Sequence, residues 1–249
     1  MDRIATALAD AVPGTITYGA EVTRIRQTPR GAQVFYSSGG RPQRPVLADF
    51  CVCTIPLTVL APIAQSSDFT PERKAAIASV PYADTSKVAL QFKRRFWEDD
   101  ERILGGITQT NLDVSTIWYP SEGYLVKPKG VVVGAYNFGG NAVSYGNSTP
   151  LQRIERALAQ GEKVHPQYRA EYESGWTVAW QKVRYSQGGW ASWSGSARAT
   201  TYPLLLQPDG RIYIAGEHMS YIGSWQAGGF ESARRVVSEI HARAVAAAA

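Results

Sequence analysis

Apolar and polar residues alternate along the first part of the chain in the way that is typical of β-strands. The alternation runs through residues 22–25, 34–36 and 46–55, and the sequences PRG and SGG, which favour turns, lie between these segments. A strand patterned in this way places one of its faces on a core. The pattern therefore predicts a β-meander that ends in a buried strand at residues 46–55.

Residues 85–97, TSKVALQFKRRFW, predict a longer strand. Val88, Leu90 and Phe92 would share one face, and Lys87 lies on the other. Further strands or extended segments are predicted at STIWYP (115–120), GVVVGAYNF (130–138), GWTVAWQKVRYSQGGWASW (175–193) and RIYIAG (211–216).

Apolar residues at helical spacing predict four helices. The first covers residues 2–11 and ends at VPG, and the second, PERKAAIASV, begins at Pro71 behind Thr70, a good capping residue. The third is TPLQRIERALAQ, residues 149–160. The last has an apolar face made of Ala227, Phe230, Ala233, Val237, Ile240 and Ala244. Because strands outnumber helices in this mixed order, the predicted fold class is α+β.

Composition and charge narrow the class of protein. The 249 residues, 44% of them apolar, can bury a substantial core, so the chain is globular. Its net charge of +5 comes from scattered Lys and Arg with no run of five, which argues against a nucleic-acid partner. No apolar stretch reaches about 18 residues and no signal peptide is recognisable, so we expect no membrane partner and a cytoplasmic protein.

The two cysteines, Cys51 and Cys53, are two residues apart in a predicted strand. Side chains two apart in a strand point to the same face, where they are poorly placed to form a disulfide. Without further Cys or nearby His they make no zinc site. We expect them to be buried structural thiols.

The sequence RIYIAGEHMSYIGSWQAGGFESARR, residues 211–235, combines a strand, a Gly-Glu turn and a glycine-rich helix start. A helix N-terminus offers free N–H groups and partial positive charge, and glycines let a ligand approach the backbone closely. The segment therefore predicts an anion or cofactor site. Strand-turn-helix units with glycines also occur for packing reasons alone, and the pattern by itself leaves both interpretations open.

Four other segments of the chain, taken together with residues 211–235, are informative about the family. They are EVTRIRQT (21–28), FCVCTIPLTVL (50–60), SKVALQFKRRFW (86–97) and WQKVRYSQGGWASW (180–193). In this order, and over essentially the whole chain, the five segments resemble the flavin-containing amine oxidase family, which includes monoamine, polyamine and L-amino acid oxidases.

The resemblance implies FAD as the cofactor. Val22 would contact the adenine through its backbone, and Gly216 and Glu217 would lie by the pyrophosphate and the ribityl chain. Amides at a helix N-terminus would stabilise the negative charge that builds on the reduced flavin. The cofactor-binding set implied by the resemblance is Val22, Gly216, Glu217, Ser224, Trp225 and Gln226.

The resemblance also implies four catalytic residues. Lys87 matches the lysine that holds a water against the flavin; its alternative role is that of an exposed strand lysine. Trp190 and Trp225 match the two aromatic positions that flank the substrate amine. Tyr119 falls where amino acid oxidases carry a tyrosine that helps hold the substrate carboxylate. Trp118 would face the other way, and the sequence leaves open which of the two faces the site.

Three features of the family have no counterpart in the chain: its dinucleotide-binding motif, the N-terminal acidic residue that binds the ribose, and the arginine that fixes the substrate carboxylate in amino acid oxidases. The Gly-x-Gly-x-x-Gly motif of its dinucleotide-binding fold is absent, because the glycine pairs at 39–40, 105–106 and 139–140 have the wrong spacing. We therefore expect the chain to be the C-terminal portion of such an enzyme, completed by a second polypeptide that carries the dinucleotide-binding half.

The resemblance implies a division into parts. Residues 1–60 and 205–249 would belong to an FAD-binding domain completed by the partner, and residues 61–204 would form a substrate domain, a mixed sheet flanked by helices.

The leading function is an FAD-dependent L-amino acid oxidase. It converts an amino acid to an imine and then to a keto acid and ammonia, while oxygen is reduced to hydrogen peroxide. A monoamine or polyamine oxidase, or an amino acid monooxygenase, is the alternative within the enzyme class. A non-catalytic assembly subunit with an incomplete FAD site is the alternative outside it.

Overall fold

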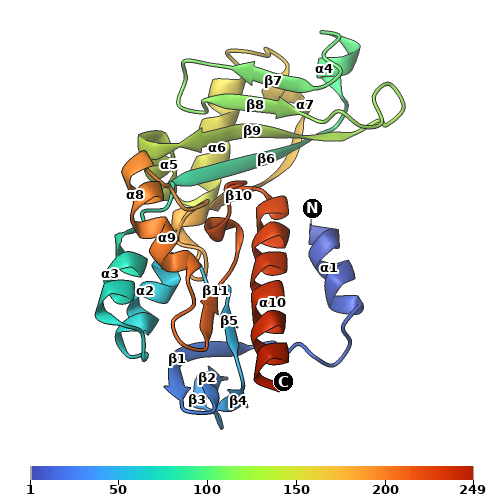
Figure 1. Cartoon of the computed structure of the whole chain (residues 1–249). Coiled ribbons are helices and arrows are strands. Elements are labelled where there is room, and N and C mark those ends of the chain that lie inside the picture. The colour runs from blue at the N-terminus through green and yellow to red at the C-terminus, as the bar shows by residue number, and fades with distance from the viewer. Residues whose placement is uncertain (1, 249) are drawn as a thin grey trace.

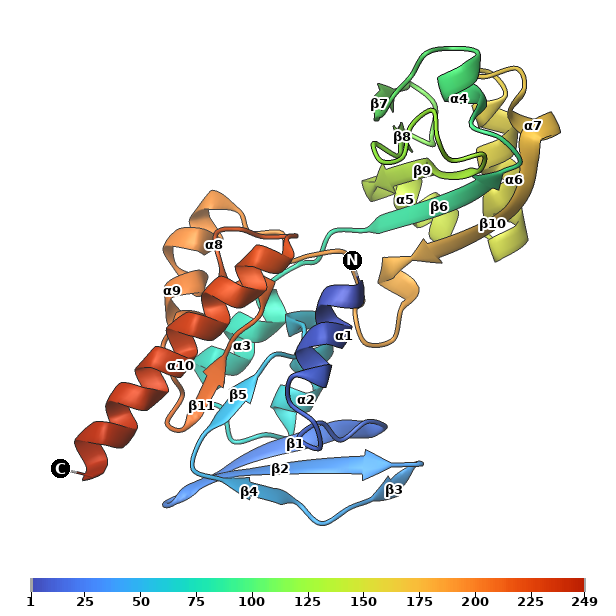
Figure 2. The ribbon, with the colours of Figure 1, turned by 90° about the vertical axis from the view of Figure 1, so that its right-hand side faces the viewer.

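The computed structural model describes residues 2–248 and has two lobes (Figure 1). The upper lobe in Figure 1 is one sheet with helices beside it, and the lower lobe holds the smaller sheets and both ends of the chain. Because the upper lobe is a single stretch of sequence from β6 to β10, the chain passes between the lobes twice (Figure 2). The predicted α+β class is confirmed.

The sheet of the upper lobe has the strand order β10-β6-β9-β8-β7. Every neighbouring pair is antiparallel, so the sheet is not mixed as the resemblance implied. Val88, Leu90 and Phe92 are buried on one face, as the alternation of β6 predicts. The strands are β6 (Thr85–Phe92), β7 (Gly106–Gln109), β8 (Thr116–Tyr119), β9 (Gly130–Phe138) and β10 (Tyr172–Ala179).

Helices cover that buried face of the sheet. The longest, α6 (Pro150–Gly161), packs on β6, β9 and β10 and begins with a capping box between Thr149 and Gln152. The shorter ones are α4 (Phe96–Asp99), α5 (Gly139–Gly146) and α7 (Tyr168–Glu171). The rings of Phe92, Trp97 and Tyr168 are fully buried in the resulting core.

The lower lobe begins with a small antiparallel sheet. Its strands are β1 (Ala20–Thr28), β2 (Gly31–Ser38), β3 (Arg41–Pro42) and β4 (Val46–Ala48), with β2 paired to the other three. Ile25 of β1 packs in a core with the helices of this lobe. The helices of that core are α2 (Leu57–Gln65), α3 (Pro71–Ser79) and α9 (Thr201–Leu206), and α8 (Gly195–Ala199) lies beside α9. The predicted cap of α3 is confirmed, because the Thr70 side chain accepts a hydrogen bond from the backbone N–H of Arg73.

The buried strand predicted at residues 46–55 is wrong. The segment divides into β4, which is exposed at the edge of β2, and β5 (Cys51–Cys53), which leaves that sheet. Asp49 and Phe50 turn the chain between β4 and β5. As a result, β5 pairs in parallel with β11 (Ile212–Ile214). Cys53 is buried and Cys51 is half-buried, and burial raises the pKa of both thiols, to about 12 and about 11.

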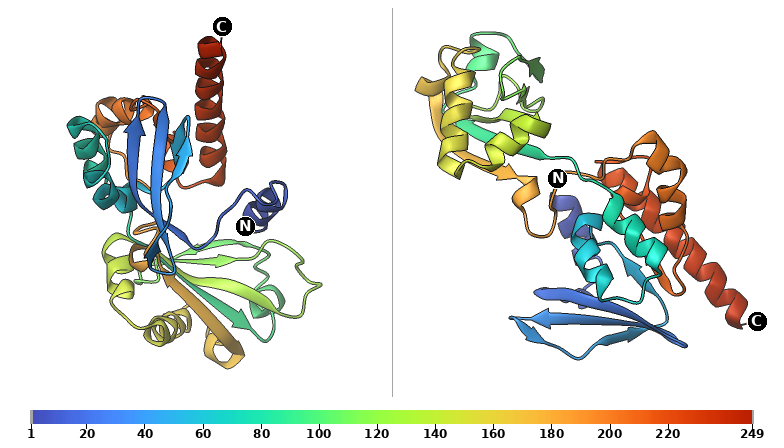
Figure 3. Two further views of the ribbon diagram at one scale, coloured as in Figure 1. Left: turned by 90° about the horizontal axis from the view of Figure 1, so that it is seen from below. Right: turned by 90° about the vertical axis from the view of Figure 1, so that its left-hand side faces the viewer.

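The two terminal helices lie on the outside of the lower lobe (Figure 3). α1 (Asp2–Asp10) has no buried residue. α10 (Gln226–Ala248) buries Ser232 and Val236, whereas Phe230 is 45% exposed and Val237 is 62% exposed. The apolar positions predicted for this helix are therefore mostly exposed, and Phe230 lines a cavity together with Ile4 and Leu8 of α1.

The packed cores do not follow the predicted boundaries at residues 61 and 205. Helices α2 and α3, within residues 57–79, and helix α9, residues 201–206, share the core of the lower lobe. Only the stretch from β6 to β10 forms the core of the upper lobe. The reason is that α2 packs on β1 and α3 packs on α9, so the helices stay with the first strands.

The two segments that pass between the lobes are hydrogen-bonded to each other. The backbone N–H of Ala83 donates to the carbonyl of Trp190 at 2.9 Å, and that of Gly189 donates to the carbonyl of Ala83 at 2.8 Å. The N–H of Ser192 donates to the carbonyl of Pro81 at 2.8 Å. We call residues 81–83 and 189–192 the crossing ladder.

No helix in residues 2–248 combines the length and the apolar character that a membrane span requires. Over the same residues, no cluster of three or more His, Cys, Asp or Glu side chains is arranged to hold a metal ion.

Candidate functional site

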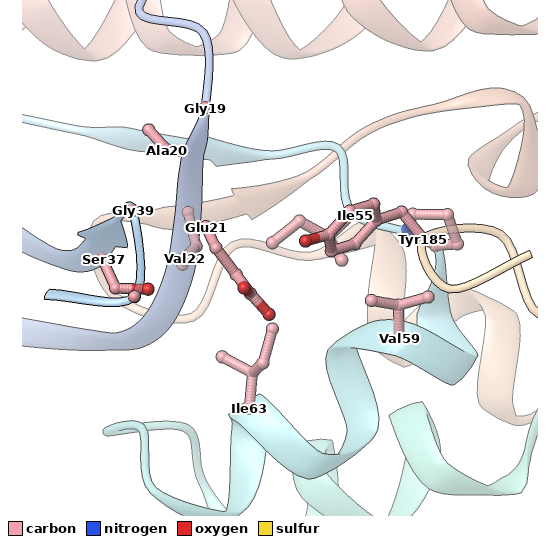
Figure 4. Close-up of a pocket in the computed structure, with 12 residues that line it drawn as sticks. Gly19, Ala20, Glu21, Val22, Ser37, Gly39, Ile55, Val59, Ile63 and Tyr185 are labelled. Carbon is pink, nitrogen blue, oxygen red and sulfur yellow. The ribbon is translucent and has the colours of Figure 1, made fainter.

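Three adjoining cavities run in a row through the lower lobe. The first, of about 490 Å³, lies between β1 and α2 (Figure 4). Val22 of β1 lines it together with Val59 and Ile63 of α2, and Tyr185 lies on the side away from Val22. The predicted cofactor residue Val22 therefore faces a cavity.

The second cavity, of about 280 Å³, adjoins the first at Pro56, which lines both. Gly216 lines it in the left-handed region at φ 133°, and a Cβ there would lie 2.4 Å from Cε1 of His218. Only glycine fits such a position without displacement of the ring. Residue 216 is thus restricted to glycine because the ring of His218 packs directly against it.

The imidazole of His218 lines the same second cavity and is buried. Its Nε2 has no hydrogen-bond partner among the described residues. Burial lowers the pKa of His218 to about 4, so the ring is neutral at pH 7. A buried polar atom of this kind calls for a partner from outside the described chain.

The third cavity, of about 400 Å³, adjoins the second at Gly189 and Glu217 and lies at the start of α10. Ser224, Trp225 and Gln226 line it. Ser224 has a φ of 65°, which is uncommon outside glycine, and the turn it makes brings Trp225 to the cavity, where it is 66% exposed. The positive end of the long helix α10 therefore points at this cavity. We call the three cavities together the groove.

Glu217 lies at the junction of the second and third cavities. Its Oε2 accepts a hydrogen bond from the backbone N–H of Ser224 at 2.6 Å, which fixes the turn before α10. Burial raises the pKa of Glu217, although the N–H groups of Ser224 and Ala191 and the charge of Arg198 act in the opposite direction. The carboxylate thus positions the predicted residues Ser224 and Trp225.

Four aromatic rings form a continuous row on the open face of the upper sheet. The ring centroids of Trp118 and Tyr136 are 5.7 Å apart, those of Tyr136 and Phe138 4.6 Å, and those of Phe138 and Trp190 5.8 Å. We call these four residues the aromatic row. Its rings offer a surface for an apolar group and, through their faces, for a cation.

Lys87 extends over the middle of the aromatic row. It pairs with Tyr136 across strands β6 and β9, and its Nζ lies 4.3 Å from the ring centroid of Tyr136. The residue is half-buried, and burial lowers the pKa of its ammonium group. Lys87 is therefore not fully exposed, and its role beside the flavin stays a prediction.

Trp190 connects the aromatic row to the groove. It follows Gly189, which lines both the second and the third cavity. A Cβ on Gly189 would lie 2.6 Å from Oγ1 of Thr85, so glycine lets this segment lie directly against the start of β6. The structure thereby brings Lys87 and Trp190 to the same end of the molecule as Glu217 and Trp225.

The side chain of Tyr119 points to the opposite face of the sheet. Its hydroxyl lies 2.5 Å from Nε2 of His165 and 3.0 Å from Oγ1 of Thr108, among the core residues of the upper lobe. The interpretation of Tyr119 as a residue that faces the site does not fit this geometry, because neighbouring strand residues alternate. Trp118, which belongs to the aromatic row, is the one of the pair that lies on the face that carries Lys87.

The family comparison decides what kind of site this is. The sequence pattern of the family described as flavin containing amine oxidoreductase matches residues 1–241. The chain belongs to this flavin-containing amine oxidoreductase family. The predicted family is confirmed, and with it a flavin as the cofactor on which the family depends.

Individual relatives agree with this assignment. The flavin-dependent L-tryptophan oxidase RebO of Lentzea aerocolonigenes is 30% identical over 252 residues, which cover 97% of this chain and 52% of that protein. An L-amino-acid oxidase of Siganus canaliculatus is 26% identical over 246 residues, covering 96% of this chain and 46% of the relative. The chain thus spans about half the length of the curated relatives that it matches.

Solved structures of the flavin-containing amine oxidoreductase fold are also similar. Cyclohexylamine oxidase from Brevibacterium oxydans gives a TM-score of 0.78 at 19% identity, with 96% of this chain and 52% of that one covered. A putrescine oxidase bound to putrescine gives a TM-score of 0.81 at 17% identity, with 97% and 53% covered. At these identities the similarity concerns the fold.

The groove fits the elongated, phosphate-bearing cofactor FAD. Its three cavities share lining residues, the buried Nε2 of His218 in the second has no partner among the described residues, and the third lies at the N-terminus of α10. The residues that would hold such a cofactor are Val22, Gly216, Glu217, Ser224, Trp225 and Gln226, together with His218.

Sequence reasoning missed four residues of the site. Tyr136 and Phe138 belong to the aromatic row, and Tyr185 and Gly189 line the groove. The alternation in GVVVGAYNF was a usable signal, because it separates Tyr136 and Phe138 from the buried Ala135 and Asn137. For Tyr185 and Gly189 the sequence held no local signal, since their places depend on contacts across the whole chain.

Proposed function

We propose that this chain supplies the C-terminal half of an FAD-dependent oxidase of an L-amino acid. The observation that carries the proposal is the junction at Gly189 and Trp190, where an aromatic row topped by Lys87 meets a groove that ends at a helix N-terminus. An amine oxidation needs these two parts side by side: a dry aromatic surface for the substrate and a cofactor site that accepts negative charge.

The flavin, when bound, supplies the acceptor for a hydride from the substrate α-carbon and passes the electrons to oxygen, so that an amino acid, oxygen and water yield a keto acid, ammonia and hydrogen peroxide. The aromatic row excludes water and orients the substrate. The N-terminus of α10 and the N–H groups around Ser224 stabilise negative charge in the third cavity. Lys87, with its lowered pKa, holds and exchanges a proton beside the Tyr136 ring.

An amino acid is the favoured substrate because two of the relatives, at 30% and 26% identity, are oxidases of L-tryptophan and of L-amino acids. Trp190 and Trp225 flank the reacting amine in this proposal. Tyr136 and Trp118 take the place that the sequence had assigned to Tyr119, because both lie on the face that carries Lys87.

The other half of the enzyme is a second polypeptide with the dinucleotide-binding fold. Three observations support it: the chain spans about half the length of its relatives, α10 exposes Phe230 and Val237, and β5 and β11 form a parallel sheet of only two short strands. Parallel sheets are normally larger and covered on both faces. A cytoplasmic location, in keeping with the free thiols of Cys51 and Cys53, is part of the proposal.

The test is reconstitution. The chain is expressed alone and together with a polypeptide that carries a Gly-x-Gly-x-x-Gly half, and flavin absorbance and peroxide release are measured on a panel of L-amino acids and amines. We expect flavin and peroxide only for the pair. A pair that binds flavin and oxidises nothing would identify a non-catalytic assembly subunit, and activity restricted to simple amines would identify an amine oxidase.

Lys87→Met provides the matched variant. We expect it to lower kcat/KM by about 100-fold, the range of general acid–base effects, while flavin binding persists. Lys163→Met, which removes an exposed lysine of the upper lobe, is the control and leaves kcat/KM unchanged.

A further inference from the structure

Strand β9 changes the phase of its alternation half-way along its length. Gly134 and Ala135 are both buried, and Tyr136 then lies on the open face of the sheet. The register of β9 shifts at the same point against both of its neighbours, β6 and β8, as it does at a β-bulge. Without the additional residue, Ala135 would lie on the open face and Tyr136 would point to the core. The bulge therefore places Tyr136 in the aromatic row.

The core of the upper lobe keeps this bulge in place. A Cβ on Gly134 would lie 2.5 Å from Cδ1 of Leu90 and 2.8 Å from the hydroxyl oxygen of Tyr168. Both neighbours are fully buried, and close-packed side chains do not move aside without cost. Glycine at residue 134 thus lets β9 lie directly on the core, as is usual for a glycine at a bulge.

The bulge interrupts the ladder between β8 and β9 where two residues of the aromatic row meet. Thr116 pairs with Tyr136 and Trp118 pairs with Val133, with the shift in register between the two pairs. The residue before Thr116 is strained, because Ser115 has a φ of 59°, in the left-handed region that serine seldom adopts. Regular backbone pairing therefore does not by itself fix Trp118 relative to Tyr136.

The side chain of Thr116 bridges the interruption. Its Oγ1 accepts a hydrogen bond from Nε1 of Trp118 at 2.9 Å and donates one to the backbone carbonyl of Tyr136 at 3.0 Å. Thr116 is only 9% exposed, whereas Trp118 is 40% exposed. One sheltered hydroxyl group thus joins two of the four residues of the aromatic row.

We propose that Thr116 is a positioning residue of the oxidase and acts through Trp118 and Tyr136, an inference that rests on the proposed function. The hydroxyl fixes the tilt of the two rings, whose planes are at 55° to each other. A partly exposed indole without this bond would have to be ordered when the substrate binds, at a cost in affinity. Lys87 lies over the same Tyr136 ring, so the bond also keeps the row aligned with its ammonium group.

The first test uses the isolated chain and needs no flavin. In NMR spectra we expect the indole N–H of Trp118, identified by its loss in Trp118→Phe, to be protected from solvent exchange although the side chain is 40% exposed. Thr116→Val raises its exchange rate by about 5-fold, the equivalent of one lost hydrogen bond, and Thr116→Ser retains the protection. A wild-type indole N–H that exchanges as fast as that of free tryptophan would overturn the proposal, whether or not the valine variant folds.

The second test measures the consequence for the substrate in the reconstituted enzyme. We expect Thr116→Val to raise KM by about 5-fold with kcat nearly unchanged, and Thr116→Ser to have the KM of the wild type. Thr108→Val is the matched control, because it removes a hydroxyl that contacts Tyr119 on the opposite face, and it leaves KM unchanged. An equal rise in KM for Thr116→Val and Thr108→Val, or no rise in either, contradicts the positioning role. A wild-type pair that oxidises nothing contradicts the proposed function alone, since the exchange measurement still decides the inference.

Discussion

The upper lobe and the lower lobe differ in how their cores and sheets are assembled. In the upper lobe, the rings of Phe92, Trp97 and Tyr168 are fully buried between sheet and helices, and the whole core comes from one stretch of chain. In the lower lobe, α10 exposes Phe230 and Val237, and β5 and β11 pair over three residues each. Both lobes have a buried core, but the lower lobe is less complete, because its parallel sheet has only two short strands and its last helix exposes apolar residues.

The two lobes therefore differ in how they support the candidate site. A complete core holds the aromatic row in place without help, because every side chain beneath it has its neighbours within the chain. The groove, built on the less complete lobe, has a free imidazole nitrogen at His218 and an exposed Trp225. The aromatic row is therefore held in place by the chain itself, whereas the groove depends on what binds to the lower lobe.

The largest expected effect tests the core of the upper lobe. Phe92→Ala removes a fully buried ring that contacts Phe96, Trp97 and Tyr168, and we expect it to lower the free energy of unfolding by about 3–5 kcal/mol. Urea denaturation followed by circular dichroism measures it. Val131→Ala, on the open face, is the comparison and costs much less; equal losses would mean that the two faces are not packed differently.

The second effect concerns acid sensitivity in the lower lobe. The folded-state pKa of His218 is lowered to about 4 from an ordinary 6.5, so its contribution to stability is complete above pH 6.5 and is lost as the pH falls through 4. At pH 4 the loss is on the order of 3 kcal/mol. His218→Gln removes this slope in urea unfolding measured from pH 7 to pH 4. His241→Gln, at an exposed position, retains the slope, and a slope shared by all three proteins would rule His218 out as its source.

The third effect contrasts the two faces of the upper sheet at adjacent residues. Tyr119→Phe removes hydrogen bonds to His165 and Thr108 and costs about 1–2 kcal/mol of unfolding free energy, with KM unchanged in the reconstituted enzyme. Trp118→Ala has the opposite signature, a KM raised by about 10-fold with little loss of stability. If the signatures were exchanged, Tyr119 and not Trp118 would face the substrate.

The smallest expected effect on the stability of the isolated chain tests whether a partner covers the exposed face of α10. Val237→Asp changes an exposed position, so we expect the unfolding free energy to change by less than about 0.5 kcal/mol. Its consequence lies in assembly, because a charge on the covered face prevents association with the companion polypeptide in a pull-down assay. Val126→Asp, on the upper lobe, leaves association intact. Normal association of both variants would show that the partner binds elsewhere.

Much of the fold could be predicted from local pattern. α6 was predicted nearly to the residue from its apolar spacing, and the start of β6 was predicted from strict alternation. The predicted strand continued to residue 97, whereas β6 ends at Phe92 and Phe96 begins α4. The strand at residues 46–55 was wrong, since its division between two sheets depends on pairing with β11, far away in sequence. The helix α10 formed as its apolar spacing predicted, but the spacing does not show which chain covers its apolar face.

Several residues that the family resemblance selected lie at the groove or in the aromatic row, and their roles stay predictions. The groove includes Val22, Gly216, Glu217 and Trp225, and the aromatic row includes Trp190. The choice between Trp118 and Tyr119 was not predictable. Alternation shows that the two side chains lie on opposite faces of the sheet, and only packing shows which face is buried. Gly189 was missed for a similar reason: its closeness to Thr85 arises from the crossing ladder.

The crossing ladder sets the distance between the aromatic row and the groove with backbone hydrogen bonds, from Ala83 to Trp190 and from Gly189 to Ala83. Backbone bonds of this kind do not depend on side-chain identity. Substitutions on the open sheet can therefore change which molecule is bound without moving it relative to the start of α10. A lineage built on this frame can diversify its substrates by surface mutation alone, while the geometry of the reacting centre is inherited unchanged.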